Sequence, residues 1–558
     1  VTSDFLECIN SIGKMGEGQL IQERPREYIE QFHDPLFSRS ASHQERFALP
    51  AHSLRTGIQS TEFHIPTKRS QKIDGAKKRS VNEEGGGCHR KYSNAAPIPS
   101  HPLMNHSPQP GSRKEVLRLA WPIAISMMSF TIKGFVDTLM VGQLGTDVLG
   151  AVGLASVATW MAMTFPWGIL RGQRPLISQY LGAGQPEKAF SFGIHAFALA
   201  LFCGLAVLIF SGPLTSAFGI YAGSTDLSIG GVQIASDYFL TRMQWLLPTF
   251  LTLAIAEYLR SVGETRVPML VDIFVHPLNI FFNWILIFGH LGFEPMGAKG
   301  AALGTGIADV CALSLIFVIV KPKHKLTIGL LKLKLDRLRE VLSVGFTGAV
   351  QFSLEAVSFV TITWFIGKTG TVAVAVHQVG IQLIHVSMLG GAAIADGGSV
   401  LIGKYVGEKN YTAVRKTLRS TLEIMTPYML LIGACFIIFR EQIGDMFINN
   451  DDPVEYATAM RLSSGVLIAA AIWQLGDALQ IAFRFALRAA GDHVWVMWAG
   501  ILCTWLLSMP VAWVVVFVFN GDVADVWMAW NVEIFVGAAV FVHRWRSGKW
   551  AKKRLVND

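Results

Sequence analysis

The chain carries little charge for its length. Of its 558 residues, 16% are Asp, Glu, Lys or Arg, whereas about a quarter of an ordinary soluble domain is charged. Aromatic side chains are abundant by contrast, with 35 Phe and 15 Trp. This composition excludes a soluble enzyme, a nucleic-acid-binding protein and a disordered hub as descriptions of the body of the chain, and it predicts a membrane protein.

Cysteine is also scarce, and the motifs of catalysis are missing. The six Cys are scattered, without a CxxC pair or finger spacing, so we expect neither a disulfide framework nor a zinc site. The sequence contains no HExxH, no GxSxG and no nucleotide-binding loop. A membrane enzyme and an ATP-driven pump are therefore disfavoured, and we expect no cofactor.

The first fifth of the chain differs from the rest. Residues 1–112 hold 14 Lys and Arg and 12 Asp and Glu, and no apolar run there is long enough to span a bilayer. This composition predicts disorder, and the segment has neither the apolar core of a secretory signal nor the acid-poor composition of a transit peptide. We expect residues 1–111 to be a disordered or spurious N-terminal extension. Met104 is a candidate start, and a cytosolic tail or a targeting segment are the alternatives.

The remainder contains twelve apolar stretches. A bilayer core of about 30 Å needs about 20 apolar residues in a helix. We therefore predict an all-α membrane protein with twelve spans, at residues 116–140, 148–170, 190–212, 235–258, 267–289, 300–320, 341–366, 373–399, 417–439, 458–483, 494–519 and 525–543.

Positive charge alternates between the connections of these spans. The connections on one side, among them Arg484 and Arg488 after the tenth span, hold 28 Lys and Arg, and those on the other side hold 4. The positive-inside rule places the richer side in the cytosol. Both termini are then cytosolic in the plasma (inner) membrane, and the net charge of +8 requires no nucleic-acid partner.

The sequence repeats itself at a spacing of 225 residues. Gly172, Leu176, Tyr180 and Gly182 recur as Gly397, Leu401, Tyr405 and Gly407. A shift of 228 superposes LRSVGE at 259–264 on LRAAGD at 487–492. Six spans per copy is an even number, so a pseudo-twofold axis along the membrane normal must relate the copies. We predict an N-lobe at 112–320, a cytosolic linker at 321–340, a C-lobe at 341–545 and a basic tail at 546–558.

Several strings resemble one family of transporters. FVDTLMVGQLGT, PLISQYLGAGQPEKA, LRSVGETRVPM, HPLNIFFNWILIFG, WQLGDALQ and LRAAGD occur in this order. They resemble the multidrug and toxic compound extrusion (MATE) family, and its NorM-like bacterial branch looks closest. The resemblance covers about residues 112–545. It implies two six-helix lobes that export organic cations against an inward flow of Na⁺ or H⁺.

Acidic residues inside spans are expensive and mark candidate functional positions. Asp137 lies in the first span, Glu355 in the seventh and Asp477 in the tenth. The resemblance implies that all three couple ion and substrate, with Na⁺ possible at Glu355 and Asp477 and no other metal site. A buried carboxylate can hold Na⁺, H⁺ or a substrate cation in turn, and this exclusivity is the physical basis of antiport.

Polar neighbours share the helical faces of these acids. Asn279 and Asn283 are four residues apart on the fifth span, so one face carries both amides. They match cavity-lining positions of the family, and interhelical hydrogen bonding is the alternative role. Lys133 lies one turn before Asp137 and could pair with it.

In the seventh and tenth spans the acids also have neighbours one turn away. Gln351 precedes Glu355 by four residues, and Trp473 precedes Asp477 by four. NorM-like members tend to have Tyr at the position of Trp473, and an indole offers no oxygen to a cation. This departure leaves the coupling ion open. Arg242 and Glu257, in the fourth span, are expected near the membrane interface.

Two further charges fall on equivalent positions of the repeat. Arg171 aligns with Asp396 under the shift of 225. Residues related by a twofold axis meet if they lie near it, so we expect this pair to join the lobes when the cytosolic side is closed. Anchoring of Arg171 at the interface is the alternative.

The sequence thus favours a secondary active multidrug exporter, expected to be a monomer, over two alternatives. A major facilitator would carry a basic GxxxDRxGRR-type loop after its second span, where this chain reads YLGAGQPEKA. A flippase for lipid-linked oligosaccharides would need a basic cleft for the diphosphate, and the acids expected in the cleft outnumber bases.

Overall fold

A computed structural model describes residues 109–225, 227–324, 333–447 and 452–556. The expected N-terminal extension lies almost wholly outside the described residues, as does much of the predicted linker. The first six spans are formed by α2 (Arg113–Gly142), α3 (Thr146–Arg171) with α4 (Gln173–Gly182), α5 (Pro186–Ala222), α6 (Ile229–Gln244) with α7 (Leu246–Ser261), α8 (Arg266–Phe288) and α9 (Gly297–His324).

The second six spans follow the same plan. They are α11 (Leu335–Gly367), α12 (Thr371–Gly407), α13 (Tyr411–Ile438), α15 (Pro453–Ala489), the run of α16 (His493–Leu502), η4 (Cys503–Ser508) and α17 (Met509–Phe517), and finally α18 (Val523–Arg546). Two short elements are added, α14 (Arg440–Phe447) and η5 (Lys549–Lys552). Within the described ranges no strand is present.

All twelve predicted spans are confirmed as helices. Eleven are long and apolar enough to cross a bilayer, and the twelfth is the fourth span, in which α6 and α7 meet at a bend of 47°. Pro248 lies just after this bend and has no N–H to donate to the carbonyl four residues earlier, which accounts for the break in the helix. Large apolar side chains such as Phe130, Ile209 and Val318 are exposed, as expected of surfaces that face lipid.

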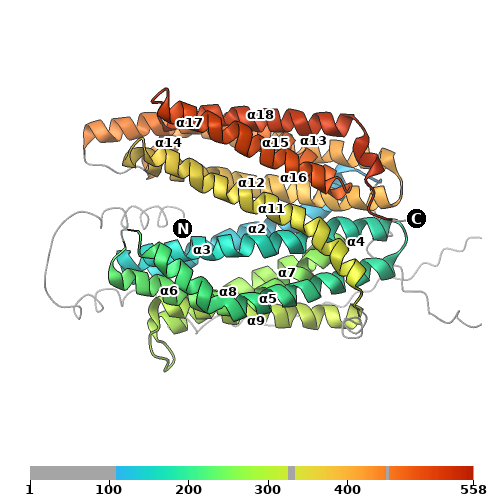
Figure 1. Cartoon of the computed structure of the whole chain (residues 1–558), viewed down its shortest axis with the longest axis horizontal. Helices are drawn as coiled ribbons and strands as arrows, with labels where there is room; N and C mark the ends of the chain where they lie inside the picture. Colours follow the sequence, from blue (N-terminus) through green and yellow to red (C-terminus); the bar gives the residue numbers. More distant parts are fainter. Residues whose placement is uncertain (1–108, 226, 325–332, 448–451, 557–558) are drawn as a thin grey trace, which may run out of the picture. The chain divides into compact units, whose positions relative to one another are not determined.

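The helices pack within two lobes and across the boundary between them. In the first half α8 packs on α2 and α9, and in the second α15 packs on α12, α13 and α18. Across the boundary α3 lies against α11, and both α2 and α4 lie against α12 (Figure 1). The interlobe contacts therefore come mainly from the first two spans of each repeat.

Contacts between the lobes obey the repeat. Gly172 is packed so closely on Gly345 that a Cβ would clash with the backbone, and Gly397, its equivalent 225 positions on, is packed in the same way on Ala120, the equivalent of Gly345. Only residues with small or no side chains permit such an approach. The paired contacts are what a pseudo-twofold axis between the lobes requires.

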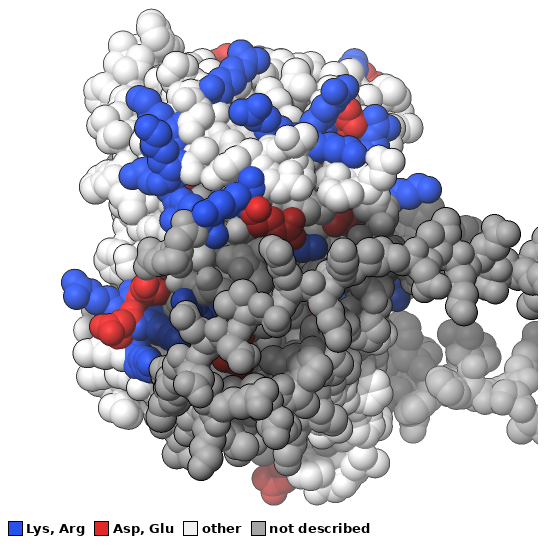
Figure 2. Space-filling view, turned by 90° about the vertical axis from the view of Figure 1, so that its right-hand side faces the viewer, with Lys and Arg blue, Asp and Glu red and all other residues white. Residues whose placement is uncertain are grey.

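Basic side chains gather at one end of the spans. Figure 2 views the end at which α4 and the C-terminal residues lie, and many Lys and Arg side chains are visible there. The last turn of α18 contributes Arg544 and Arg546 to this end, and the residues after it contribute Lys549 and Lys552. This end is the one that the sequence predicts to be cytosolic.

Candidate transport site

The N-lobe holds its predicted acid in a network of polar side chains. Asn283 on α8 donates from Nδ2 to Oδ1 of Asp137 on α2 over 2.7 Å, and Lys133 Nζ lies 3.8 Å from Oδ2. Asn279, one turn earlier on α8, donates to Thr305 on α9 over 3.2 Å. The structure therefore brings Asp137, Asn283 and Lys133 together, while Asn279 bonds to a different helix.

Both Asn side chains keep an unused acceptor. Asn279 and Asn283 are fully buried, and among the described residues neither Oδ1 has a hydrogen-bond partner. A buried carbonyl without a donor is costly. These two oxygens are consequently available to a bound cation or to a proton donor.

Arg242 and Glu257, two charges of the fourth span, both interact with charged groups of the N-lobe. Arg242 lies at the end of α6 beside the bend, its Nη1 is buried without a hydrogen bond within the described chain, and it interacts electrostatically with Asp137. Glu257 is buried and bonded to Arg174. Their position near the membrane interface stays a prediction; hydropathy locates a span and does not show which charges inside it meet a partner.

The C-lobe acid Glu355 is already part of an ion pair. Arg484 on α15 places its Nη1 2.7 Å from Glu355 Oε1, and Gln351, one turn earlier on α11, donates to the same oxygen over 2.7 Å. Arg488 donates in turn to Gln351 Oε1 over 2.5 Å. Gly500 on α16 leaves the space that the Gln351 side chain occupies.

The positions of Arg484 and Arg488 correct the sequence analysis, which assigned them to a cytosolic connection. Helix α15 continues to Ala489, so both arginines belong to the helix that carries Asp477. Residues 477, 480, 484 and 488 follow each other at helical spacing, so they share one face of α15. Two basic groups therefore face the C-lobe acids.

Asp477 has no such partner. Its side chain is buried, with the residue 7% exposed, and no hydrogen bond or ion pair to it is present among the described residues. Arg484, which is bonded to Glu355, interacts with it only electrostatically. One turn earlier, Trp473 packs edge-on against Trp530 of α18, with ring centroids 4.9 Å apart. Phe359 packs on Trp530 at 5.4 Å, so an aromatic wall adjoins the unpaired carboxylate.

A third C-lobe acid, Glu533 on α18, was missed by the sequence analysis. It is 8% exposed, and Gln480 on α15 donates to its Oε1 over 3.4 Å. A signal was available, because Glu533 lies in the middle of the predicted span 525–543. The rule that drew attention to Asp477, an acid inside an apolar span, applies equally to Glu533.

Arg171 and Asp396 meet across the lobes. Arg171 Nη2 donates to both carboxylate oxygens of Asp396, at 3.1 and 3.0 Å. Arg174, three residues further along the chain, is bonded to the same carboxylate. It is also bonded to Glu257 of α7, at 2.5 Å. Arg260 adds a bond to Glu257 at 3.1 Å. This interlobe network ties α12 of one lobe to α3, α4 and α7 of the other.

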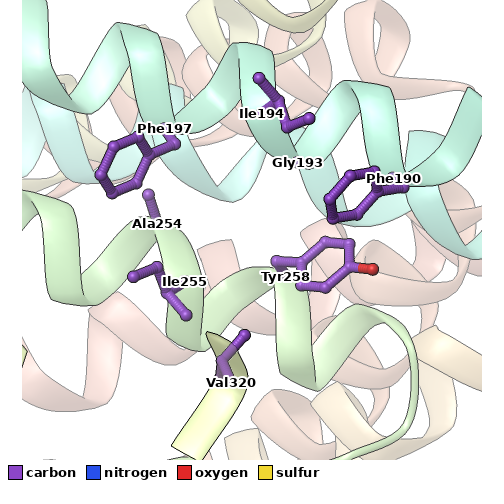
Figure 3. A pocket seen from close by; sticks show the side chains of 8 residues that line it. All are labelled: Phe190, Gly193, Ile194, Phe197, Ala254, Ile255, Tyr258 and Val320. Carbon is purple, nitrogen blue, oxygen red and sulfur yellow. The ribbon is translucent and has the colours of Figure 1, made fainter. Parts of the chain in front are cut away.

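The N-lobe also contains a small apolar crevice. It is bounded by α5, α7 and α9, and Figure 3 shows the side chains that line it. These are Phe190, Gly193, Ile194, Phe197, Ala254, Ile255, Tyr258 and Val320. The lining lacks the charged and amide groups of the two acid sites, and we assign no function to it.

Comparison with known proteins agrees with the fold and the repeat. The MatE family model matches residues 122–285 and again 349–514. A protein of Bacillus subtilis described as the uncharacterized transporter YisQ is 27% identical over 444 residues, which cover 78% of this chain and 95% of that protein. The probable multidrug resistance protein NorM of Synechocystis is 27% identical over 442 residues, 78% of this chain and 94% of that protein.

The fold also matches a solved structure. An outward-facing multidrug resistance MATE family transporter of the MOP superfamily superposes with a TM-score of 0.71 at 20% identity, over 78% of this chain and 96% of that one. The match extends over both halves of the described chain.

Proposed function

Because the chain belongs to the MATE family of membrane transporters, we propose that it exports small organic cations from the cytosol in exchange for inward-moving Na⁺ or H⁺. Members of this family are transporters and not enzymes, and they use ion coupling. The multidrug resistance function of the NorM relatives supports the choice of substrate class.

The unpaired carboxylate of Asp477 carries this proposal. An ionised carboxyl group taken out of water without a directly bonded counter-ion is disfavoured. Arg484 acts on Asp477 only through space and is already bonded to Glu355, so the site favours binding of a proton or another cation. A monovalent drug cation and the coupling ion then compete for the same negative charge. That competition supplies the exclusivity that antiport needs.

The aromatic wall beside Asp477 supports organic cations as substrates. Trp473 and Trp530 are in contact, and Phe359 extends the wall toward α11. Faces of indole and phenyl rings attract cations with a delocalised or shielded charge, worth about 0.5–2 kcal/mol per contact. A planar cationic dye such as ethidium suits this chemistry. Because Trp473 and Trp530 are buried in the core, at 7% and 5% exposure, the dye would contact their faces only in a conformation that opens this part of the lobe.

A flippase of lipid-linked oligosaccharides is less well supported. Arginines do gather between and inside the lobes, but Arg171, Arg174 and Arg484 are each bonded to a carboxylate. A diphosphate would need donors that are not already committed. Among the described residues Arg488 and Arg242 are not bonded to a carboxylate, so the preference for cationic cargo rests on the excess of carboxylates in the C-lobe.

The arrangement of charges also supports a topology. We place the end of the spans shown in Figure 2 in the cytosol, with both termini there, because basic residues concentrate at cytosolic ends. We further propose that the lobes extend over residues 112–320 and 341–545, that the chain functions as a monomer, and that it resides in the plasma membrane. Crosslinking of the purified protein in membranes tests the monomer.

The function is tested by ethidium efflux from proteoliposomes under separately imposed Na⁺ and H⁺ gradients. We expect one of the two gradients to drive uphill efflux and an ionophore for that ion to abolish it, with ATP having no effect. Equal efflux without any gradient would contradict coupled transport. A transporter that moves labelled lipid and leaves ethidium in place would support the flippase instead.

A further inference from the structure

The charges inside the C-lobe do not balance. We define the C-lobe cluster as Glu355, Asp477, Glu533, Arg484 and Arg488, three carboxylates and two guanidinium groups contributed by α11, α15 and α18. If all five are ionised, one negative charge is left over. In a buried setting this excess favours one additional monovalent cation.

The excess charge is localised by the bonding pattern. Arg484 is bonded to Glu355, and Arg488 is bonded to the amide of Gln351 next to it, so both guanidinium groups are held on the α11 side. Asp477 and Glu533 receive no ion pair among the described residues. They lie on the two helices that pack against each other over their length, α15 and α18.

The two helices carry matching sequences on their facing surfaces. Trp473 precedes Asp477 by one turn on α15, and Trp530 precedes Glu533 by about one turn on α18, with the two indoles in contact. Gln480, one turn beyond Asp477, reaches α18 where Gly537 leaves room for its amide, and it donates to Glu533. Asp477 and Glu533 interact electrostatically as like charges, so each lies within the field of the other.

We propose that Asp477 and Glu533 together hold one monovalent cation, H⁺ or Na⁺, and that Glu355 is a positioning residue. Glu355 holds Arg484 in a direct bond, so that Arg484 acts on the other two carboxylates only through space. Glu533 is the new member of the site. Gln480 offers a carbonyl oxygen to the same ion once its amide donates to Glu533. The identification of this ion as the coupling ion rests on the proposed function, whereas its binding does not.

Other titratable groups around Glu533 are few and mostly committed. Glu355 and Arg484 interact with it from α11 and α15, and Cys503 faces it from η4. On α12, His377 is bonded to Trp527 over 3.0 Å and to Thr363 over 3.0 Å. The pH dependence of ion binding should therefore report the carboxylate pair, whose two protonation steps are coupled.

The test is ion binding to the purified protein without any drug, so that failure of drug export does not affect it. Binding of radioactive Na⁺ is measured by equilibrium methods. Proton uptake is measured for each variant and for the natural protein, and the two values are compared. Glu533→Gln should weaken Na⁺ binding at least about tenfold, or abolish one proton of the uptake, because it removes the excess charge. Glu455→Gln, at an exposed position of α15, is the matched control and should bind as the natural protein does.

A pair of variants tests the role of Glu355. Glu355→Gln releases Arg484, which then neutralises Asp477 and Glu533, so ion binding should fall by about tenfold. Adding Arg484→Gln removes the released charge, and the double variant should recover to within about threefold of the natural protein. A direct ligand role for Glu355 predicts no recovery.

Two results of these measurements would overturn the proposal. The proposal would be overturned if Glu533→Gln bound the ion as tightly as the natural protein does and eluted unchanged in size-exclusion chromatography. Failure of the double variant to recover what Glu355→Gln loses would also overturn it. If Glu533→Gln does not fold, Glu533→Asp keeps the charge and should bind the ion, and the Glu355 and Arg484 variants decide the question.

Discussion

The two lobes are copies in sequence, and their acids are neutralised differently. In the N-lobe, Asp137 accepts a hydrogen bond from Asn283 and has an ammonium group, that of Lys133, 3.8 Å away. In the C-lobe, Arg484 is bonded to Glu355, and within the described ranges Asp477 has no hydrogen bond or ion pair and feels Arg484 only through space. The two halves therefore share their helices and their interlobe contacts. The carboxylate without a directly bonded base, by contrast, lies in the C-lobe.

This contrast follows from where each lobe places its bases. Lys133 is on the same helix as Asp137, one turn away, so the pair forms whenever α2 does. Arg484 is two turns from Asp477 on α15 and meets Glu355 of α11 instead. The bond between Arg484 and Glu355 links α15 to α11 and leaves Asp477 without a directly bonded base among the described residues.

The largest expected effect is that of Asp477→Asn. The amide keeps the size of the side chain and removes its charge, so gradient-driven ethidium efflux should fall at least about tenfold, about 1.4 kcal/mol of lost coupling. Glu355→Gln should reduce efflux by a similar factor, through release of Arg484. Membrane levels, measured by immunoblot, should stay normal for both.

The comparison between the lobes gives this prediction its control. Asp137→Asn should reduce efflux less, because the N-lobe carboxylate already has an ammonium group beside it. If Asp477→Asn and Glu355→Gln transported at near natural rates while Asp137→Asn abolished transport, the C-lobe assignment would be wrong and the N-lobe would carry the ion alone.

An intermediate effect is expected at the interlobe network. Arg171→Asp and Asp396→Arg should each lower efflux several-fold, because each breaks the bonds that close the lobes on each other. The double charge swap should restore part of the loss in the same efflux assay. Full restoration is not expected, since Arg174 also bonds to Asp396 and would face a second arginine. A double variant as inactive as the worse single one would argue against a gate at this pair.

The smallest effect is expected for Lys133→Met. Without the ammonium group, Asp137 is no longer assisted in staying ionised and keeps its proton at higher pH. The pH optimum of efflux should move upward by a fraction of a unit, as measured in vesicles over a series of buffers. An unchanged pH dependence of efflux, at normal expression, would contradict the role given to Lys133.

The twelve spans and the repeat could be predicted because each is visible in many residues of the sequence at once. Each span is an apolar stretch of about 20 residues, and the shift of 225 superposes residues that the structure places in equivalent interlobe contacts, as at Gly172 and Gly397. The bend between α6 and α7 was not predicted, although Pro248 marks it. Proline alone does not reveal whether neighbouring helices hold a span straight.

The site could be predicted only in part. Asp137 was singled out as an acid inside an apolar span, Asn283 by helical spacing and the family resemblance, and the pair of Arg171 with Asp396 by the repeat. These are properties of one or two aligned segments. Arg484 was counted in a cytosolic connection because hydropathy ends a span at the first strong charges, whereas α15 continues to Ala489 and brings Arg484 to Glu355 of α11. Such a contact between distant segments leaves no local signal.

The location of the coupling ion is tested most directly by counting the ions released when ethidium binds to the purified protein. Proton release is obtained from calorimetry in buffers of different ionisation enthalpy, and Na⁺ release from displacement of the radioactive ion. The account predicts about one ion released per ethidium in the natural protein and in Asp137→Asn, and none in Asp477→Asn. Normal release by Asp477→Asn, with loss of release in Asp137→Asn, would contradict it.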